Sequence, residues 1–208
     1  MTLARLEVPI DPAFPVPQKV RALLADAASR IDQFVEVHKN DPAAGFVPSD
    51  YEAVYRALAA LHKGAAGVIL PGNAFCEWGS GLGVIAALAA MIGYDAVGIE
   101  IDARLVAASR LLADDHRVNV ELVRGSYVPD GHEPDEDFND SHVMTLESGR
   151  AAYDELGLDP DDFDCIFAYP WPGEDDVVTA IFDRYAARGA VLLTFHGQDG
   201  LLIRRKVK

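Results

Sequence analysis

An acid followed by three alternating glycines is the part of this sequence whose residue types point most directly to chemistry. The stretch Phe75–Gly83 reads Phe-Cys-Glu-Trp-Gly-Ser-Gly-Leu-Gly, and an alanine- and leucine-rich run follows it. Because glycine has no Cβ, a turn of this composition can bend sharply and let a ligand lie against the main chain. A second acid, Glu100, closes the next apolar run. This spacing favours a seat for a nucleoside-bearing cofactor.

Four expected strand ends bring further polar and aromatic groups to the same place. In an open α/β sheet, ligands bind beyond the carboxyl ends of the strands, near the point where the strand order reverses. There Glu100 can accept hydrogen bonds from ribose hydroxyls, Ile101 can lie on an adenine face, and Ser126 can bond the adenine amino edge. Main-chain amides near Gly79 and Gly81 can meet a carboxylate or a ribose. The cofactor-binding residues expected from this reasoning are Glu77, Gly79, Ser80, Gly81, Gly83, Glu100, Ile101 and Ser126.

Alternating strands and helices must position these groups. The expected strands span residues 74–78, 96–101, 119–124, 163–168 and 190–195, and the helices between them span residues 82–92, 103–113, 146–156 and 175–187. Each strand is a continuous apolar run, as a parallel sheet covered on both faces requires. Repeated alternation of this kind predicts an open α/β sheet with right-handed crossovers.

Two helices are expected before this alternating region. Helical spacing of apolar residues predicts one over Gln18–Val37. Ser49, with Glu52 three residues later, forms a capping box that predicts the start of the second. We therefore expect an N-terminal part, residues 1–64, packed on an α/β part, residues 65–208, in one compact domain.

Composition and charge restrict the class of partner. The chain has 33 acidic and 18 basic residues and a net charge of −15. This charge disfavours nucleic-acid backbones and anionic membranes, and it leaves small molecules and basic proteins as partners. Cys76 and Cys165 lie in apolar runs, which predicts buried free thiols in a reducing compartment and no disulfide or zinc site. Without a membrane-spanning run or a signal-peptide pattern, we expect a cytoplasmic protein with no metal site.

The glycine turn does not fit a dinucleotide site, because a Gly-x-Gly-x-x-Gly fingerprint would need a third glycine where Val84 stands. In the register acid-x-Gly-x-Gly-x-Gly, Glu77–Gly83 resembles the first motif of class I S-adenosylmethionine-dependent methyltransferases. Val97–Glu100 resembles their second-strand motif, which ends in the ribose-binding acid. The resemblance covers about residues 46–195. A Phe-Val-Pro segment at residues 46–48 and the Gly-Ser-Gly-x-Gly turn are similar to small protein-lysine methyltransferases.

The resemblance implies a fold, a cofactor and a reaction. The fold would be a doubly wound, mostly parallel α/β sheet in which the five strands take the order 3-2-1-4-5. The cofactor would be S-adenosyl-L-methionine, and the reaction would be transfer of its methyl group to a small-molecule or protein acceptor. Tyr169 and Trp171, after the fourth strand, are then the candidate catalytic residues, facing the sulfonium or a substrate ammonium.

Three departures from the family pattern accompany this resemblance. Ser126 stands where the family commonly has an acid. After the fourth strand, residues 168–174 read Ala-Tyr-Pro-Trp-Pro-Gly-Glu and not the Asn/Asp-Pro-Pro-Tyr/Phe signature of amino-methylating enzymes. The C-terminus is too short for the usual last helix and strand, so we expect a trimmed sheet edge, with Gly200–Val207 as a last edge strand.

Each feature also has a simpler interpretation. The glycine turn can be a tight connection, Glu77 can stabilise a helix N-terminus, and Tyr169–Pro172 can be a rigid loop that only packs. The acidic segment Asp130–Ser141 is interpreted as a solvated loop, with a divalent cation or a basic partner as the alternative. His196 is interpreted as structural. The alternative functions are a non-catalytic module that binds S-adenosylmethionine or a nucleoside, and a nicotinamide-dependent oxidoreductase.

Overall fold

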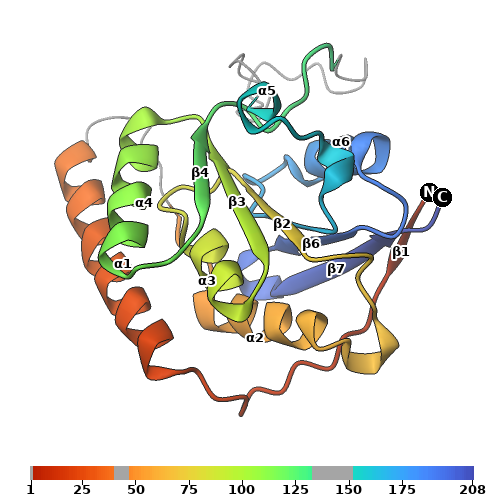
Figure 1. Cartoon of the computed structure of the whole chain (residues 1–208), viewed down its shortest axis with the longest axis horizontal. Helices are drawn as coiled ribbons and strands as arrows, with labels where there is room; N and C mark the ends of the chain where they lie inside the picture. The colour runs from red at the N-terminus through yellow and green to blue at the C-terminus, as the bar shows by residue number, and fades with distance from the viewer. Residues whose placement is uncertain (1, 40–46, 133–151) are drawn as a thin grey trace.

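A seven-stranded sheet forms the centre of the molecule (Figure 1). The computed structural model describes residues 2–39, 47–132 and 152–208. The strands are β1 (Leu3–Arg5), β2 (Ala74–Trp78), β3 (Asp95–Glu100), β4 (Glu121–Arg124), β5 (Cys165–Ala168), β6 (Val191–Phe195) and β7 (Leu201–Lys206). Their order across the sheet is β1-β7-β6-β5-β2-β3-β4. The run from β4 to β6 reproduces the expected order 3-2-1-4-5 and confirms the doubly wound α/β class.

The strands in the middle of the sheet are parallel and are buried on both faces, because the helices that connect parallel strands cover the sheet. Strand β2 pairs in parallel with β3 and β5, so that Phe75 lies opposite Ala96 and Cys165. Strands β3 and β4, and β5 and β6, also pair in parallel. Every residue of β5 and β6 is buried. Continuous burial of this kind needs helices on both faces, and parallel pairing puts the carboxyl ends of these strands at one edge.

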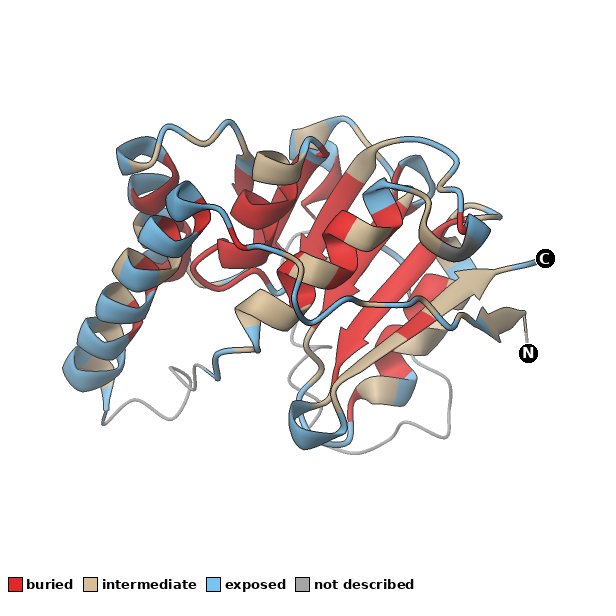
Figure 2. Ribbon diagram, turned by 90° about the horizontal axis from the view of Figure 1, so that it is seen from below, coloured by how far each residue is buried: buried red, intermediate tan, exposed pale blue. Residues whose placement is uncertain are grey.

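Helices cover both faces of the sheet. They are α1 (Gln18–His38), α2 (Tyr51–His62), α3 (Val84–Ile92), α4 (Ala103–Asp115), α5 (Tyr153–Leu156) and α6 (Asp175–Tyr185), with 3-10 turns η2 (Ala65–Gly67), η5 (Pro160–Asp162) and η6 (Gly197–Asp199). One hydrophobic cluster joins α1, α2, α3 and α4 to one face and includes Leu23, Leu58 and Leu88. A second cluster joins α5 and α6 to the other face through Tyr153 and Phe182. Figure 2 shows the buried residues running through the strands and the inner sides of the helices.

None of the helices in the described ranges is both long enough and apolar enough to cross a membrane.

Helix α2 begins at a different cap from the one the sequence predicts. Asp50 is the N-cap, and its Oδ1 accepts the N–H of Ala53 at 3.0 Å. Glu52 pairs with Arg56 one turn further on, at 2.8 Å. The expected Ser49–Glu52 capping box is therefore wrong. Serine and aspartate cap helices about equally well, so their spacing alone does not choose between two neighbouring candidates.

The strand nearest the C-terminus does not lie at the edge of the sheet. Strand β7 forms within Gly200–Val207 as expected and pairs antiparallel with β6. However, β1 pairs antiparallel with its outer side, with Ala4 opposite Arg205. The N-H of Val207 also donates to the carbonyl of Thr2 at 2.8 Å, so both termini lie side by side (Figure 1). The expected edge position of this strand is wrong, because N-terminal residues extend the trimmed edge.

Two expected segments fall partly outside the described residues. The acidic segment Asp130–Ser141 is described only as far as residue 132, and the helix expected over residues 146–156 only from residue 152. Within the described part of that helix, α5 occupies Tyr153–Leu156.

Replacing Asp50 by alanine should lower the free energy of unfolding by about 1 kcal/mol, because the N–H of Ala53 loses its acceptor. The matched control, Ser49→Ala, should change stability by less than about 0.5 kcal/mol. Chemical denaturation of both variants measures the difference. Equal losses in the two variants, or a loss confined to Ser49→Ala, would support the Ser49–Glu52 capping box instead.

Candidate functional site

The turn between β2 and α3 contains three glycines in the left-handed region. Gly79, Gly81 and Gly83 have φ values of 66°, 54° and 66°, which residues with a Cβ rarely adopt. The N–H of Ser80 donates to the carbonyl of Ile99 on β3 at 2.8 Å, and the N–H of Gly83 donates to the carbonyl of Ser80 at 2.7 Å. The turn is therefore a fixed surface of main chain at the carboxyl end of β2.

Gly79 and Gly83 are suited to glycine for different physical reasons. A Cβ at Gly79 would meet no other heavy atom within 4 Å, so the space beside it is open. A Cβ at Gly83 would lie 2.8 Å from Cδ2 of Leu122 and 3.2 Å from Cβ of Ser109. Gly83 therefore allows close packing of α3 on its neighbours, whereas Gly79 is where a ligand can approach the main chain.

Glu77 stabilises the start of helix α3. Its side chain is buried, and Oε2 accepts the N–H of Ala86 in the first helical turn at 2.8 Å. Burial raises the pKa of Glu77 well above its ordinary value, the amides of Ala86 and Ile85 act in the opposite direction, and the charge of Glu100 raises it further. The structure places Glu77 at a helix terminus, the simpler of the two interpretations considered above.

Glu100 brings a second carboxylate to the turn from the neighbouring strand. Its Oε2 accepts the N–H of Gly81 at 2.7 Å, and its Oε1 accepts the N–H of Asp102 at 2.9 Å. The residue is only 8% exposed, and this burial raises the pKa of its carboxyl group against the effect of those amides. The amide of Ile101 also acts on this carboxylate. A carboxylate has about four lone pairs, so the three amides together still leave acceptor capacity for a ligand hydroxyl. Two residues 19 positions apart in the sequence are thus brought into direct contact.

The other side chains expected to contact the cofactor, those of Ile101, Ser126 and Ser80, differ in how accessible they are to a ligand. Ile101 is 46% exposed and offers an apolar surface at the end of β3. Ser126 is buried, and its Oγ accepts the N–H of Val128 at 3.0 Å, which leaves one lone pair. Ser80 is also buried, and its Oγ lies beneath the turn, against Gly98. Of these three side chains, that of Ser80 faces the sheet instead of the open side of the turn.

The two candidate catalytic residues follow the carboxyl end of β5. The pairing of Trp78 with Ala168 makes the ends of β2 and β5 neighbours. Tyr169 is partly buried and packs edge-to-face against the phenylalanine that ends β6, with 5.1 Å between ring centroids. Trp171 is 39% exposed. The strand pairing therefore brings both aromatic residues to the edge that carries the glycine turn.

An aromatic stack beside the turn was not predicted from the sequence. The rings of Trp78 and Tyr127 are stacked, with centroids 5.0 Å apart and an interplanar angle of 5°. The hydroxyl of Tyr153 donates to the carbonyl of Tyr127 at 2.8 Å. Tyr127 follows the third expected strand, but nothing in its local sequence indicates that it meets Trp78.

Tyr51, the first residue of α2, was also not predicted to lie near the site. Burial raises its pKa, and the negative charge of Glu77 raises it further. This coupling indicates that the phenol lies within electrostatic reach of the Glu77 carboxylate. The only sequence signal for it was its place just after the Phe-Val-Pro segment at residues 46–48.

His196 belongs to a polar network between β6, β7 and α6. Its Nε2 lies 2.7 Å from Oγ1 of Thr194 and 3.7 Å from Oδ1 of Asp175. Arg204 donates to Thr179 at 2.8 Å and to Thr194 at 3.3 Å. These contacts agree with the structural interpretation of His196.

Solved methyltransferases share this fold at low sequence identity. A methyltransferase from Geobacter sulfurreducens has a TM-score of 0.54 and 15% identity, over 92% of this chain and 99% of that one. A protein from Klebsiella pneumoniae, provisionally assigned as an O-methyltransferase, has a TM-score of 0.50 and 16% identity, over 88% and 66%. An O-methyltransferase from Bacillus cereus, solved with S-adenosylhomocysteine, has a TM-score of 0.49 and 16% identity, over 88% and 68%.

The likeness in fold rests on the first two of these structures. The chain spans about two thirds of the length of the proteins from Klebsiella pneumoniae and Bacillus cereus. No protein-family model and no curated protein matches the sequence. The comparison with the first two structures therefore shows that this chain has the Rossmann-like fold of methyltransferases.

Replacing Gly79 and Gly83 by alanine, one at a time, should show that Gly83 is closely packed whereas the space beside Gly79 is open. Gly83→Ala should lower the free energy of unfolding by about 3 kcal/mol or more, because the new methyl group meets Leu122 and Ser109. Gly79→Ala has the same φ but no steric neighbour, so its loss should be about 1 kcal/mol. Thermal and chemical denaturation compare the pair. Similar losses in both variants would mean that Gly79 is also closed in by its surroundings.

The change Glu77→Gln should stabilise the protein at neutral pH but not near pH 4. The native pKa of Glu77 lies above the ordinary value of 4.5, so the native state binds this proton more tightly than the unfolded state. As pH rises from 4.5 through the raised pKa, wild-type stability falls, whereas glutamine carries no charge and keeps an oxygen for Ala86. Denaturation across this pH range measures the difference. A constant difference between the two proteins would show that ionisation of Glu77 is not the cause.

Proposed function

We propose that this protein is an S-adenosyl-L-methionine-dependent methyltransferase. The observation that carries the proposal is the contact between Glu100 and Gly81, which holds a carboxylate with spare lone pairs beside open main chain at Gly79. A ribose needs acceptors for two hydroxyls, and a ligand that lies against main chain needs a surface without side chains. The fold shared with solved methyltransferases supports the same conclusion.

The residues at the strand ends suit the parts of this cofactor. Glu100 accepts hydrogen bonds from the ribose, Ile101 packs against the adenine, and the main chain at Gly79 lies against the amino-acid end. A cation bound beside Glu100 favours the ionised carboxylate, so it opposes the pKa increase that burial causes. The open space at Gly79 is the part of the turn that a Cβ would fill.

The chain's own contribution to methyl transfer is to position the acceptor. The cofactor supplies an activated methyl group on a sulfonium, so the protein must hold the acceptor lone pair in line with the S–CH3 bond. Tyr169 and Trp171, which follow β5, form the neighbouring side of the site. The acceptor is a small molecule or a protein amine that presents an unprotonated nucleophile.

A non-catalytic module that binds S-adenosylmethionine is the second candidate. It is favoured by residues 168–174, which lack the Asn/Asp-Pro-Pro-Tyr/Phe signature of amino-methylating enzymes. Transfer of a labelled methyl group from the cofactor to any protein or metabolite of a cell lysate would exclude it.

Titration calorimetry with S-adenosylhomocysteine should show binding to the wild-type protein and weaker binding to Glu100→Gln and Gly79→Ala. We expect affinity losses of about tenfold or more, because the first change removes charge-assisted hydrogen bonds and the second fills the open space. Glu121→Gln, an exposed acid on β4, is the matched control and should bind like the wild type. No binding at millimolar ligand, or tighter binding of NAD, would overturn the proposed function.

The variant Trp171→Ala should weaken binding of S-adenosylmethionine more than binding of S-adenosylhomocysteine. Only the former carries a positive charge, and a cation–π contact is worth about 0.5–2 kcal/mol, or roughly 2- to 30-fold in affinity. Calorimetry with both ligands measures the ratio. An equal effect on both would assign Trp171 to packing alone.

A further inference from the structure

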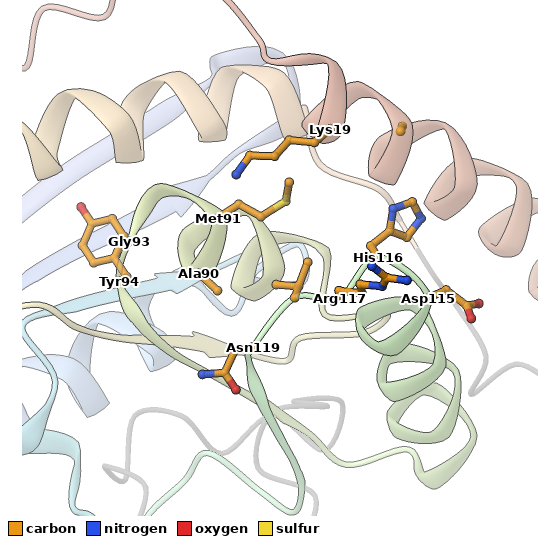
Figure 3. Close-up of a pocket in the computed structure, with 11 residues that line it drawn as sticks. Lys19, Ala90, Met91, Gly93, Tyr94, Asp115, His116, Arg117 and Asn119 are labelled. Atoms are coloured by element: carbon orange, nitrogen blue, oxygen red, sulfur yellow. The ribbon is translucent and has the colours of Figure 1, made fainter.

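A methyl acceptor must reach the carboxyl edge of the sheet, where the proposed cofactor site lies. A hollow of about 580 Å³ lies elsewhere, between the start of α1, the end of α3 and the turn from α4 to β4 (Figure 3). Tyr94 and Asn119 line it and stand just before β3 and β4, so it is at the amino edge of the sheet. The contacts with an acceptor must therefore come from segments at the carboxyl edge, such as the one that joins β5 to α6.

Residues 169–174, which we call the β5–α6 segment, have little backbone freedom. The residues on either side of Trp171 are prolines, whose rings fix φ. Gly173 has a φ of 91°, and the N–H of Glu174 donates to the carbonyl of Trp171 at 2.9 Å, which closes a turn. Trp171 is thus held on a stiff support although it is 39% exposed. A side chain held in this way loses little freedom when a ligand binds to it.

The start of the β5–α6 segment lies against the end of β6 and the turn that follows it. Ala168 pairs with Thr194, which makes Tyr169 a neighbour of Phe195. The rings of Tyr169 and Phe195 are nearly perpendicular, with an interplanar angle of 83° and centroids 5.1 Å apart. A Cβ at Gly197, in η6, would lie 3.8 Å from Oη of Tyr169, so the phenol oxygen lies beside this turn.

The end of the β5–α6 segment is bound to the same hairpin by charge. Asp175, the first residue of α6, has a buried Oδ1 that makes no hydrogen bond in the part of the chain that the structure describes. Nη2 of Arg204 on β7 lies 3.5 Å from this oxygen, and Nε2 of His196 lies 3.7 Å from it. Oγ1 of Thr194 holds both basic groups, with His196 at 2.7 Å and Arg204 at 3.3 Å. A buried charge is costly unless it is paired, so the carboxylate is held beside these two side chains.

Both ends of the segment are therefore bound to the β6–β7 hairpin, and Trp171 lies between them. Given the methyltransferase function proposed above, on which this step rests, we propose that Asp175, His196 and Arg204 are positioning residues of the acceptor site. They act through the β5–α6 segment, which they hold so that Trp171 and Tyr169 face the acceptor. Because transfer needs the acceptor lone pair in line with the S–CH3 bond, displacing this segment slows transfer and leaves cofactor affinity unchanged.

Fluorine NMR of the full chain labelled with fluorotryptophan tests the positioning. The chain has two tryptophans, Trp78 and Trp171, and Trp171→Phe assigns their resonances. We expect Asp175→Ala to shift or split the resonance of Trp171 and to leave that of Trp78 in place. Asp176→Ala is the matched control, because it removes an exposed carboxylate from the same helical turn and should leave both resonances unchanged. An unmoved Trp171 resonance in Asp175→Ala would overturn the proposal.

Methyl transfer separates positioning from a purely structural role. With S-adenosyl-L-methionine labelled in its methyl group and a cell lysate as the source of acceptors, Asp175→Ala should transfer about tenfold more slowly than Asp176→Ala, or slower still. Calorimetry should give both variants the wild-type affinity for S-adenosylhomocysteine. If Asp175→Ala does not fold, Asp175→Asn keeps the size of the side chain and replaces it, with Asp176→Asn as the control.

The behaviour of the wild type distinguishes this proposal from the proposed function. A wild type that binds no S-adenosylhomocysteine would overturn the methyltransferase function, and the acceptor site with it. A wild type that binds this ligand and transfers methyl groups no faster than Asp175→Ala would overturn the positioning role alone. Weaker binding of S-adenosylhomocysteine by Asp175→Ala, but not by Asp176→Ala, would also contradict that role, because the change would then act on the cofactor site.

Discussion

The hydrogen bond from the N–H of Gly81 to the carboxylate of Glu100 is the contact on which the rest of the site depends. It exists only because β2 and β3 pair in parallel in one register, with Trp78 opposite Ile99. A shift of one residue would turn the side chain of Glu100 to the other face of the sheet. Gly98 supports this register, since a Cβ there would lie 2.8 Å from Leu122 and 3.0 Å from Ser80. The packing of the core, through this strand register, therefore sets the geometry of the site.

The site gathers negative charge in a place with little water. Glu77 and Glu100 are both buried, both have raised pKa values, and each is held by main-chain amides instead of by a basic side chain. Such an arrangement opposes folding, and perturbed carboxylates of this kind are concentrated at functional sites. A cationic ligand of the kind proposed above would favour the ionised carboxylates, so its binding would be coupled to stability through these two residues.

The central strands could be predicted because continuous apolar runs and glycine punctuation are strong local signals. The place of Glu100 followed from its position at a strand end. The partner of Glu77 could not be predicted, since the sequence does not say whether its carboxylate turns toward a helix or a ligand. Strand β1 has three residues, too few for a periodic pattern. The backbone of Arg117, which has a φ of 54° in the turn after α4, was equally unpredictable, because such a turn normally contains glycine.

The pairing of Leu3 with Lys206 has a consequence for the order in which the molecule can form. The ribosome releases Leu3 well before Lys206, because most of the sheet and its helices lie between them in the sequence. Closing so long a loop costs entropy before any contact compensates for it, so this ladder belongs to the end of folding. Until β1 pairs with it, the outer side of β7 is an unpaired strand edge.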